Sequence, residues 1–118
     1  MPERDFAARA RSQTRWPLRH DMPAVDEAGL AAARHADRLV AAAAAAGSVR
    51  WLAYFEAMPD QLRDDEPRLL RQTALRARAA YGPKDSVRDA LPADVTEPFL
   101  ESIDRLLKQL NRRDTGAA

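Results

Sequence analysis

The sequence predicts an all-α protein, a four- or five-helix bundle with short connections and Ala-rich helix packing. Three observations predict this class. Ala, the residue with the highest helix propensity, supplies 25 of the 118 residues. Apolar residues recur at three- and four-residue spacing in several segments, whereas no segment alternates as a strand does. Pro and Gly fall between these segments, where helices begin and end.

The apolar residues are sufficient for one modest core. Only 29 of them are large, and Ala makes up the rest of the apolar fraction. Because Ala lets neighbouring backbones approach closely, a thin core can still be well packed. A thin core also favours self-association, since a partner's surface adds burial that the monomer lacks. We therefore expect a protein partner, a second copy of the chain or both, with a homodimer the favoured self-assembly.

Three regions follow from proline placement and charge. Residues 1–23 form a basic arm, partly helical or flexible, which Pro17 and Pro23 interrupt. Residues 24–113 form the helical bundle domain, and residues 114–118 are expected to be a disordered tail.

The first secure helix is predicted from about Pro23 to Ala46. Proline is favoured in a first turn, and Gly47 suits the position just after a helix. The apolar residues at helical spacing define the face expected to turn inward: Val25, Ala28, Ala32, Ala36, Leu39, Ala43 and Ala46.

A short aromatic helix is predicted next, from Val49 to Met58, with Ser48 as its N-cap. It is apolar most of the way round, as central helices are. Pro59 ends or kinks this helix, and residues 60–66 are expected to form a polar link.

Two longer segments complete the bundle. A helix over 67–81, capped by Asp64 or Asp65, is expected to turn Leu69, Leu70, Thr73, Ala74, Ala77, Ala80 and Tyr81 inward. A helical turn near 86–90 follows. Thr96 then caps a helix over 97–113, whose apolar stripe is Phe99, Leu100, Ile103, Leu106, Leu107 and Leu110. Within this last helix, Asp104 is placed to pair with Lys108.

We find no catalytic or metal-binding signature. The absence of cysteine excludes disulfides, zinc–thiolate sites and cysteine nucleophiles. His35 and the His20–Asp21 pair lack partners at metal-ligand spacing. The acidic residues Asp60, Asp64, Asp65 and Glu66 are better explained as helix caps than as an acid–base pair. We therefore predict no catalytic residue, no metal ligand and no cofactor.

One helix face carries a possible interaction surface. Arg68, Arg71 and Arg78 align at helical spacing with Leu75 among them. Such a face can meet phosphates or an acidic partner, with Leu75 as an apolar anchor. The alternative is a solvated face whose arginines pair with Asp60, Asp64 or the acids of another helix.

The arm offers a second set of contacts. Arg11, Arg15 and Arg19 surround Trp16, a basic and aromatic mixture that is used on single-stranded nucleic acids. However, a net charge of +1 is far from that of a dedicated nucleic-acid-binding protein. A segment that folds onto a partner subunit explains these residues equally well.

Three functional hypotheses remain open. The first is a non-enzymatic interaction module, self-associating or an accessory or regulatory subunit. The second is a nucleic-acid-associated regulator that uses the arginine face and the arm. The third is an enzyme or ligand carrier with a pocket beside Trp51, Tyr54 and Phe55, where His35 and Glu56 are the polar candidates. No apolar run is long enough to span a membrane. The N-terminus carries Glu3 and Asp5 and lacks the apolar segment of a secretory signal, so a cytoplasmic location is expected.

Overall fold

The computed structural model describes the backbone of residues 17–116 and the side chains of residues 17–112. This part of the chain is helical and contains no strand, which confirms the predicted all-α class. Its elements are a 3-10 turn, η1 (Arg19–Asp21), and the α-helices α2 (Pro23–Ala45), α3 (Val49–Phe55), α4 (Met58–Asp64), α5 (Pro67–Ala79), α6 (Val87–Ala90) and α7 (Ala93–Gly116).

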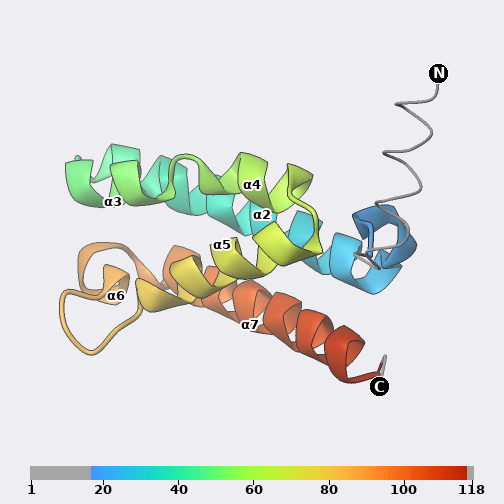
Figure 1. The fold of residues 1–118 in the computed structure, drawn as a ribbon. Helices are drawn as coiled ribbons and strands as arrows, with labels where there is room; N and C mark the ends of the chain where they lie inside the picture. The colour runs from blue at the N-terminus through green and yellow to red at the C-terminus, as the bar shows by residue number, and fades with distance from the viewer. Residues whose placement is uncertain (1–16, 117–118) are drawn as a thin grey trace.

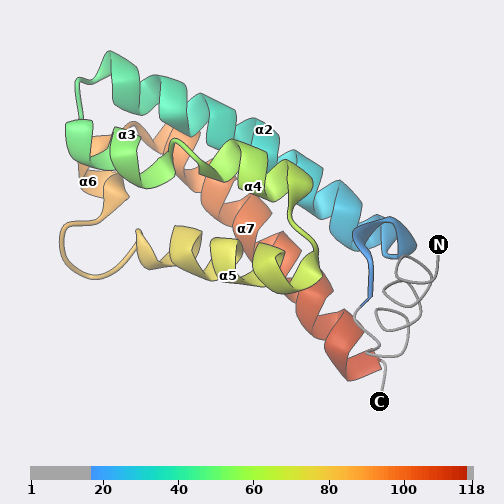
Figure 2. The ribbon, with the colours of Figure 1, turned by 45° about the horizontal axis from the view of Figure 1, so that its top comes forward.

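The two long helices, α2 and α7, make the most extensive contact in the bundle. The short helices α3 and α4 follow each other along α2, and α5 packs against α7 and α4 (Figure 1). The single turn of α6 lies at the same end of the bundle as α3 (Figure 2). Within the described residues, no helix is both long enough and apolar enough to cross a membrane.

The core combines small residues of α2 with large residues of its neighbours. Ala32, Ala33, Ala36 and Ala43 are fully buried. The largest fully buried side chains include Phe55 and Met58 beside α2 and Phe99, Ile103 and Leu106 on α7. Because Ala has little side-chain volume, α7 and α4 can lie close to α2 while bulky residues fill the remaining space. The predicted Ala-rich packing is therefore present.

The ends of α2 follow the sequence closely. Pro23 occupies its first turn, and Gly47 has a φ of +68°, the left-handed conformation that glycine adopts without steric cost. The predicted inner face is buried except at Ala46, which is exposed. This prediction was wrong because α2 ends at Ala45, so the face does not continue to Ala46.

The segment predicted as a polar link is instead a helix, α4. Pro59 lies in its first turn, where a missing N–H costs nothing, so the proline starts a helix here. Met58 and Leu62 of α4 are fully buried. The polar residues of this segment concealed that one-sided apolar face, and the link prediction was wrong.

Three further predictions on α5 and α7 are corrected. Leu69 is 45% exposed because it lies beside the buried face of α5, not on it. The residue that caps α5 is Glu66, with no side-chain hydrogen bond, in place of Asp64 or Asp65. The last helix begins at Ala93, not at Glu97, because the backbone N–H of Thr96 already donates to the carbonyl of Pro92 at 3.0 Å. Thr96 is accordingly a buried residue of the first turn, not a cap.

The predicted end regions are described only in part. The helix α7 runs to Gly116, three residues beyond its predicted end. Residues 117–118 of the predicted tail and residues 1–16 of the predicted arm lie outside the described residues.

Candidate interaction surface

The arginine face predicted from the sequence lies on α5, beside its buried face. Leu70, Thr73, Ala74 and Ala77 turn into the core, which fixes the rotation of the helix. Arg68, Leu75 and Arg78 are exposed as a result, and Arg71 is partly buried. Leu75 is 51% exposed, a large apolar side chain among cations.

An open groove of about 650 Å³ lies between α5 and α7. Three of the predicted surface residues, Arg71, Leu75 and Arg78, form its α5 side, whereas Arg68 is not among the lining residues. The α7 side consists of Asp104, Leu107, Lys108, Asn111 and Arg112. We call this feature the α5/α7 groove.

Polar contacts between described side chains link the walls of the groove. Arg71 donates through Nη1 to Oδ1 of Asn111, and Arg78 forms an ion pair with Asp104. Both arginines are thus held by the facing helix. For Arg78, the acid of another helix is the partner that the alternative interpretation of this face predicted. The expected pairing of Asp104 with Lys108 is replaced by this contact with Arg78.

The charge of the groove remains strongly positive despite these contacts. Among the described residues that line it, four are basic (Arg71, Arg78, Lys108 and Arg112) and one, Asp104, is acidic. The chain as a whole has a net charge of only +1. Positive charge is therefore concentrated in this groove, around an exposed leucine, where it favours anionic groups.

A second, smaller hollow lies between α4 and α5. Its volume is about 400 Å³, and its lining includes Gln61, Leu69 and Arg76. The side chain of Arg76 donates to Oε1 of Gln61 at 3.0 Å. Its lining holds one acidic and one basic residue, Asp65 and Arg76, so it carries no net charge to select a ligand.

Arg19, predicted as an exposed contact of the arm, is buried. Its residue exposure is 6%, and its Nε donates to Oδ1 of Asp26 at 2.6 Å. Its Nη1 donates to the carbonyl of Asp65 at 3.1 Å, and its backbone N–H donates to Oε2 of Glu66 at 2.6 Å. These partners direct the side chain against α2, so Arg19 is not available to a ligand. Its companions Arg11, Arg15 and Trp16 lie outside the described residues.

The candidate acid–base and metal groups have structural surroundings. Glu66 and the backbone carbonyl of Asp65 accept hydrogen bonds from Arg19. The side chain of Asp65 also accepts a long hydrogen bond from the hydroxyl of Thr73, at 3.4 Å. The pKa of His35 is lowered by burial and by the nearby charges of Arg38 and Arg34, against an opposing effect of Glu101. Among the described residues, no group of three or more His, Cys, Asp or Glu side chains is placed to hold a metal ion.

The aromatic residues of α3 pack against one another. The ring centre of Phe55 lies 5.0 Å from that of Tyr54 and 5.8 Å from that of Phe99 on α7, and both pairs pack edge to face. The hydroxyl of Tyr54 donates to the carbonyl of Arg76 at 2.6 Å. These rings thus join α3 to α5 and α7, and they do not line either groove described above.

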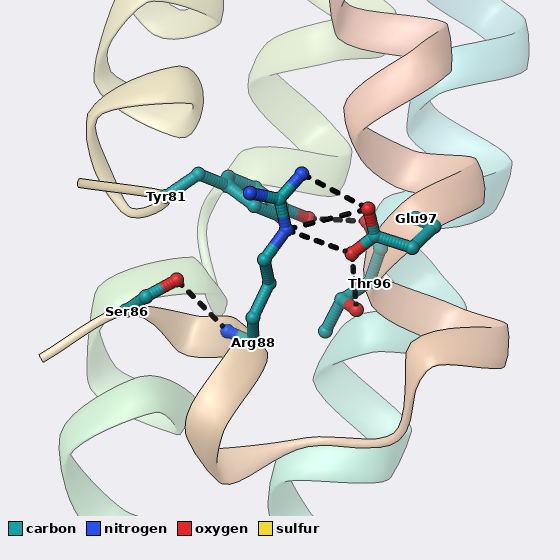
Figure 3. Close-up of polar contacts among 5 residues, drawn as sticks. All are labelled: Tyr81, Ser86, Arg88, Thr96 and Glu97. Atoms are coloured by element: carbon teal, nitrogen blue, oxygen red, sulfur yellow. Dashed lines mark hydrogen bonds and ion pairs between the residues drawn. The ribbon is translucent and has the colours of Figure 1, made fainter. Parts of the chain in front are cut away.

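A polar cluster joins the end of α5 to α6 and to the start of α7 (Figure 3). Arg88 donates from Nε and Nη2 to both carboxylate oxygens of Glu97, at 3.0–3.3 Å, and its guanidinium lies 5.3 Å from the ring centre of Tyr81. The hydroxyl of Tyr81 donates to the carbonyl of Thr96 at 2.5 Å.

The electrostatics of this cluster favour its present charge state. Hydrogen bonds from Arg88 and Thr96 lower the pKa of Glu97. Burial, followed by the charge of Glu97, raises the pKa of Tyr81. The cluster therefore fixes the corner between α5 and α7 at neutral pH.

Sequence reasoning missed the α7 side of the groove. Residues 104, 107, 108 and 111 follow three- and four-residue spacing, so they share a face beside the apolar stripe. This spacing was a usable signal for one shared face. The distance between that face and the arginines of α5 depends on tertiary packing.

Fold and groove together define a small helical bundle with a cationic groove between two of its helices. Comparison of the chain with known protein families, with characterised proteins and with solved structures finds no match.

Proposed function

We propose that this protein is a non-enzymatic interaction module, an accessory or regulatory subunit that binds a protein partner along the α5/α7 groove. One observation carries the proposal: the groove surrounds a half-exposed leucine, Leu75, with four basic side chains. An apolar anchor inside a charged rim is the usual composition of a protein-binding surface. We also propose a cytoplasmic location.

The charge of the groove argues for a partner other than a second copy in this position. If two copies met groove to groove, Arg71, Arg78, Lys108 and Arg112 of each would face the same cations. Like charges brought together in an interface cost several kcal/mol. Self-association through another face remains a separate prediction, which sedimentation at increasing concentration tests.

Nucleic acid is the second candidate because the groove is cationic. Two features make it the weaker one. Asp104 lies within the groove and repels phosphates, and the central position is occupied by an apolar side chain without an aromatic ring on which a base can stack. Binding to nucleic acid would be recognised by an affinity that falls steeply with added salt.

Site-directed photo-cross-linking in the cells that produce the protein tests the proposal. A photoreactive amino acid is introduced in the full chain in place of Leu75, and in a control in place of Val49, which is 81% exposed on α3. We expect a specific protein adduct from position 75, absent from position 49 and lost when Arg71 and Arg78 are both changed to Glu.

The adduct is identified by mass spectrometry, and the complex is reconstituted from the two purified proteins. Identical adducts from positions 75 and 49, or none from position 75, would overturn the proposal.

A further inference from the structure

We infer that the occupant of the α5/α7 groove is an acidic amphipathic helix with two carboxylates seven residues apart and an apolar residue midway between them. This inference rests on the proposed function and names the chemistry of the partner. It follows from the spacing of the groove residues, from the contacts that they make across the groove, and from their charge.

The spacing comes from α5. Arg71 and Arg78 are seven residues apart, two turns of an α-helix, which corresponds to about 10.5 Å along its axis. Leu75 lies between them on the same side. A partner helix that lies along the groove has the same rise per residue, so its side chains at i and i+7 match the two arginines. Its residue at i+3 or i+4 then faces Leu75.

The contacts show how the arginines bind oxygen ligands. Asn111 and Asp104 on α7 are also seven residues apart, and they meet Arg71 and Arg78 in the reverse order. The chain itself therefore presents two side-chain oxygens at this spacing to the two guanidinium groups. A partner's carboxylates at the same spacing reproduce that arrangement from the open side of the groove.

Both arginines can take a partner's carboxylate. At Arg71 one acceptor is the amide oxygen of Asn111. At Arg78 the present acceptor is already a carboxylate, that of Asp104. Because a guanidinium carries several N–H donors, Arg78 can hold a second carboxylate while it keeps Asp104. The same holds for Arg71, which can keep Asn111 while it binds a carboxylate of the partner.

The remaining lining residues favour the same partner. Leu107, 9% exposed, lies at the groove beside the half-exposed Leu75, so an apolar side chain of the partner can be buried between them. Lys108 and Arg112, four residues apart on α7, add positive charge along the opposite wall. A helix with one acidic and apolar face fits this arrangement, whereas a phosphate chain leaves Leu75 exposed to water.

A titration with designed peptides tests the inference. The probe is a fluorescent helical peptide with Glu at i and i+7 and Leu at i+3 and i+4. The control peptide has the same composition, with its two Glu residues moved to the opposite face. Both are added to the full chain at low ionic strength, where charge pairing is least screened. We expect the matched peptide to bind about tenfold more tightly than the control peptide.

Protein variants then locate the binding site. Arg71→Glu and Arg78→Glu each weaken the matched peptide by about tenfold. Arg34→Glu, on the exposed side of α2, makes the same charge change and leaves binding unaltered. Asp104→Asn, which removes the acid among the described residues of the groove, strengthens binding. Amide chemical shifts change within residues 71–78 and 104–112.

The outcomes separate this inference from the proposed function. If the matched peptide does not bind while photo-adducts from position 75 still depend on Arg71 and Arg78, the helix inference is overturned and the proposed function stands. Loss of both results overturns both. Equal binding of the two peptides, an equal effect of Arg34→Glu, or tighter binding of a single-stranded oligonucleotide each overturns the inference.

Discussion

Arg19 and Gly29 share one space in the bundle: a Cβ atom on Gly29 would lie 2.6 Å from Nη2 of Arg19. The same Cβ would lie 3.2 Å from the backbone carbonyl of Leu62 on α4. Glycine in the middle of α2 therefore lets both the guanidinium and the backbone of α4 approach the helix. This close approach outweighs the helix propensity that alanine would add, about 1 kcal/mol.

The pair predicts a non-additive effect on stability. We expect Gly29→Ala to lower the free energy of unfolding by about 1–3 kcal/mol, because the guanidinium of Arg19 must leave a site where it makes two hydrogen bonds. In an Arg19→Ala background the same substitution has a smaller cost. Urea unfolding of the four proteins gives the coupling energy, and simple additivity would contradict this account of Gly29.

A second prediction concerns the small residues of the core. Ala36 is fully buried on α2, whereas Ala44 is exposed on the same helix. Ala36→Val forces neighbouring helices apart and should reduce stability by about 1–3 kcal/mol. The control Ala44→Val changes only helix propensity, by less than about 0.7 kcal/mol. Equal losses in denaturant unfolding would show that the Ala residues are not needed for close packing.

The hydroxyl of Tyr81 provides a third test. Tyr81→Phe removes the donor to the carbonyl of Thr96 and leaves that carbonyl in a partly buried place. We expect a loss of about 0.5–1.5 kcal/mol in the free energy of unfolding. Tyr54→Phe removes a similar bond, to the carbonyl of Arg76, in an exposed setting. Tyr54→Phe should therefore lower the free energy of unfolding by less than Tyr81→Phe does. A larger loss for Tyr54→Phe would be evidence against a structural role for the cluster at α6.

The ionisation of Tyr81 gives a fourth prediction. Burial and the charge of Glu97 raise its pKa, so the folded protein holds the phenolic proton more tightly than the unfolded chain. Stability should consequently fall as the pH rises beyond the ordinary pKa of tyrosine, about 10. In a Tyr54→Phe background, Tyr81 is the only tyrosine, and tyrosinate absorbance follows it directly. A titration at the ordinary value without unfolding would refute the prediction.

Glu97 predicts the opposite dependence at acidic pH. Its pKa is lowered in the folded state, so its ion pair with Arg88 contributes stability above the unfolded pKa. That contribution is lost as the pH falls through the lower, folded value. The stability difference between the wild type and Glu97→Gln should therefore shrink toward zero as the pH falls. Thermal unfolding at several pH values measures it, and a difference independent of pH would exclude the ion pair as its source.

The sequence by itself determined the fold class, both ends of α2 to within a residue and the start of α3. Local signals act within a few residues: Pro23 starts α2, Gly47 ends it, and Ser48 caps α3 through its hydroxyl, 3.4 Å from the backbone nitrogen of Trp51. Apolar spacing likewise identified most of the buried faces. The local signal of the polar residues 60–66 is ambiguous, because Pro59 can end one helix or start the next.

Only the tertiary structure decided which surfaces remain open. Arg19 and Arg78 are both arginines in basic segments, yet Arg19 is buried against Gly29 and Arg78 lines a groove. The difference arises from the neighbouring helices. Arg19 contacts α2 and the end of α4, whereas Arg78 faces α7, which is distant from it in the sequence. The free energy of burying or exposing a charge depends on neighbours brought together by packing, and those neighbours cannot be inferred from periodicity along a single helix.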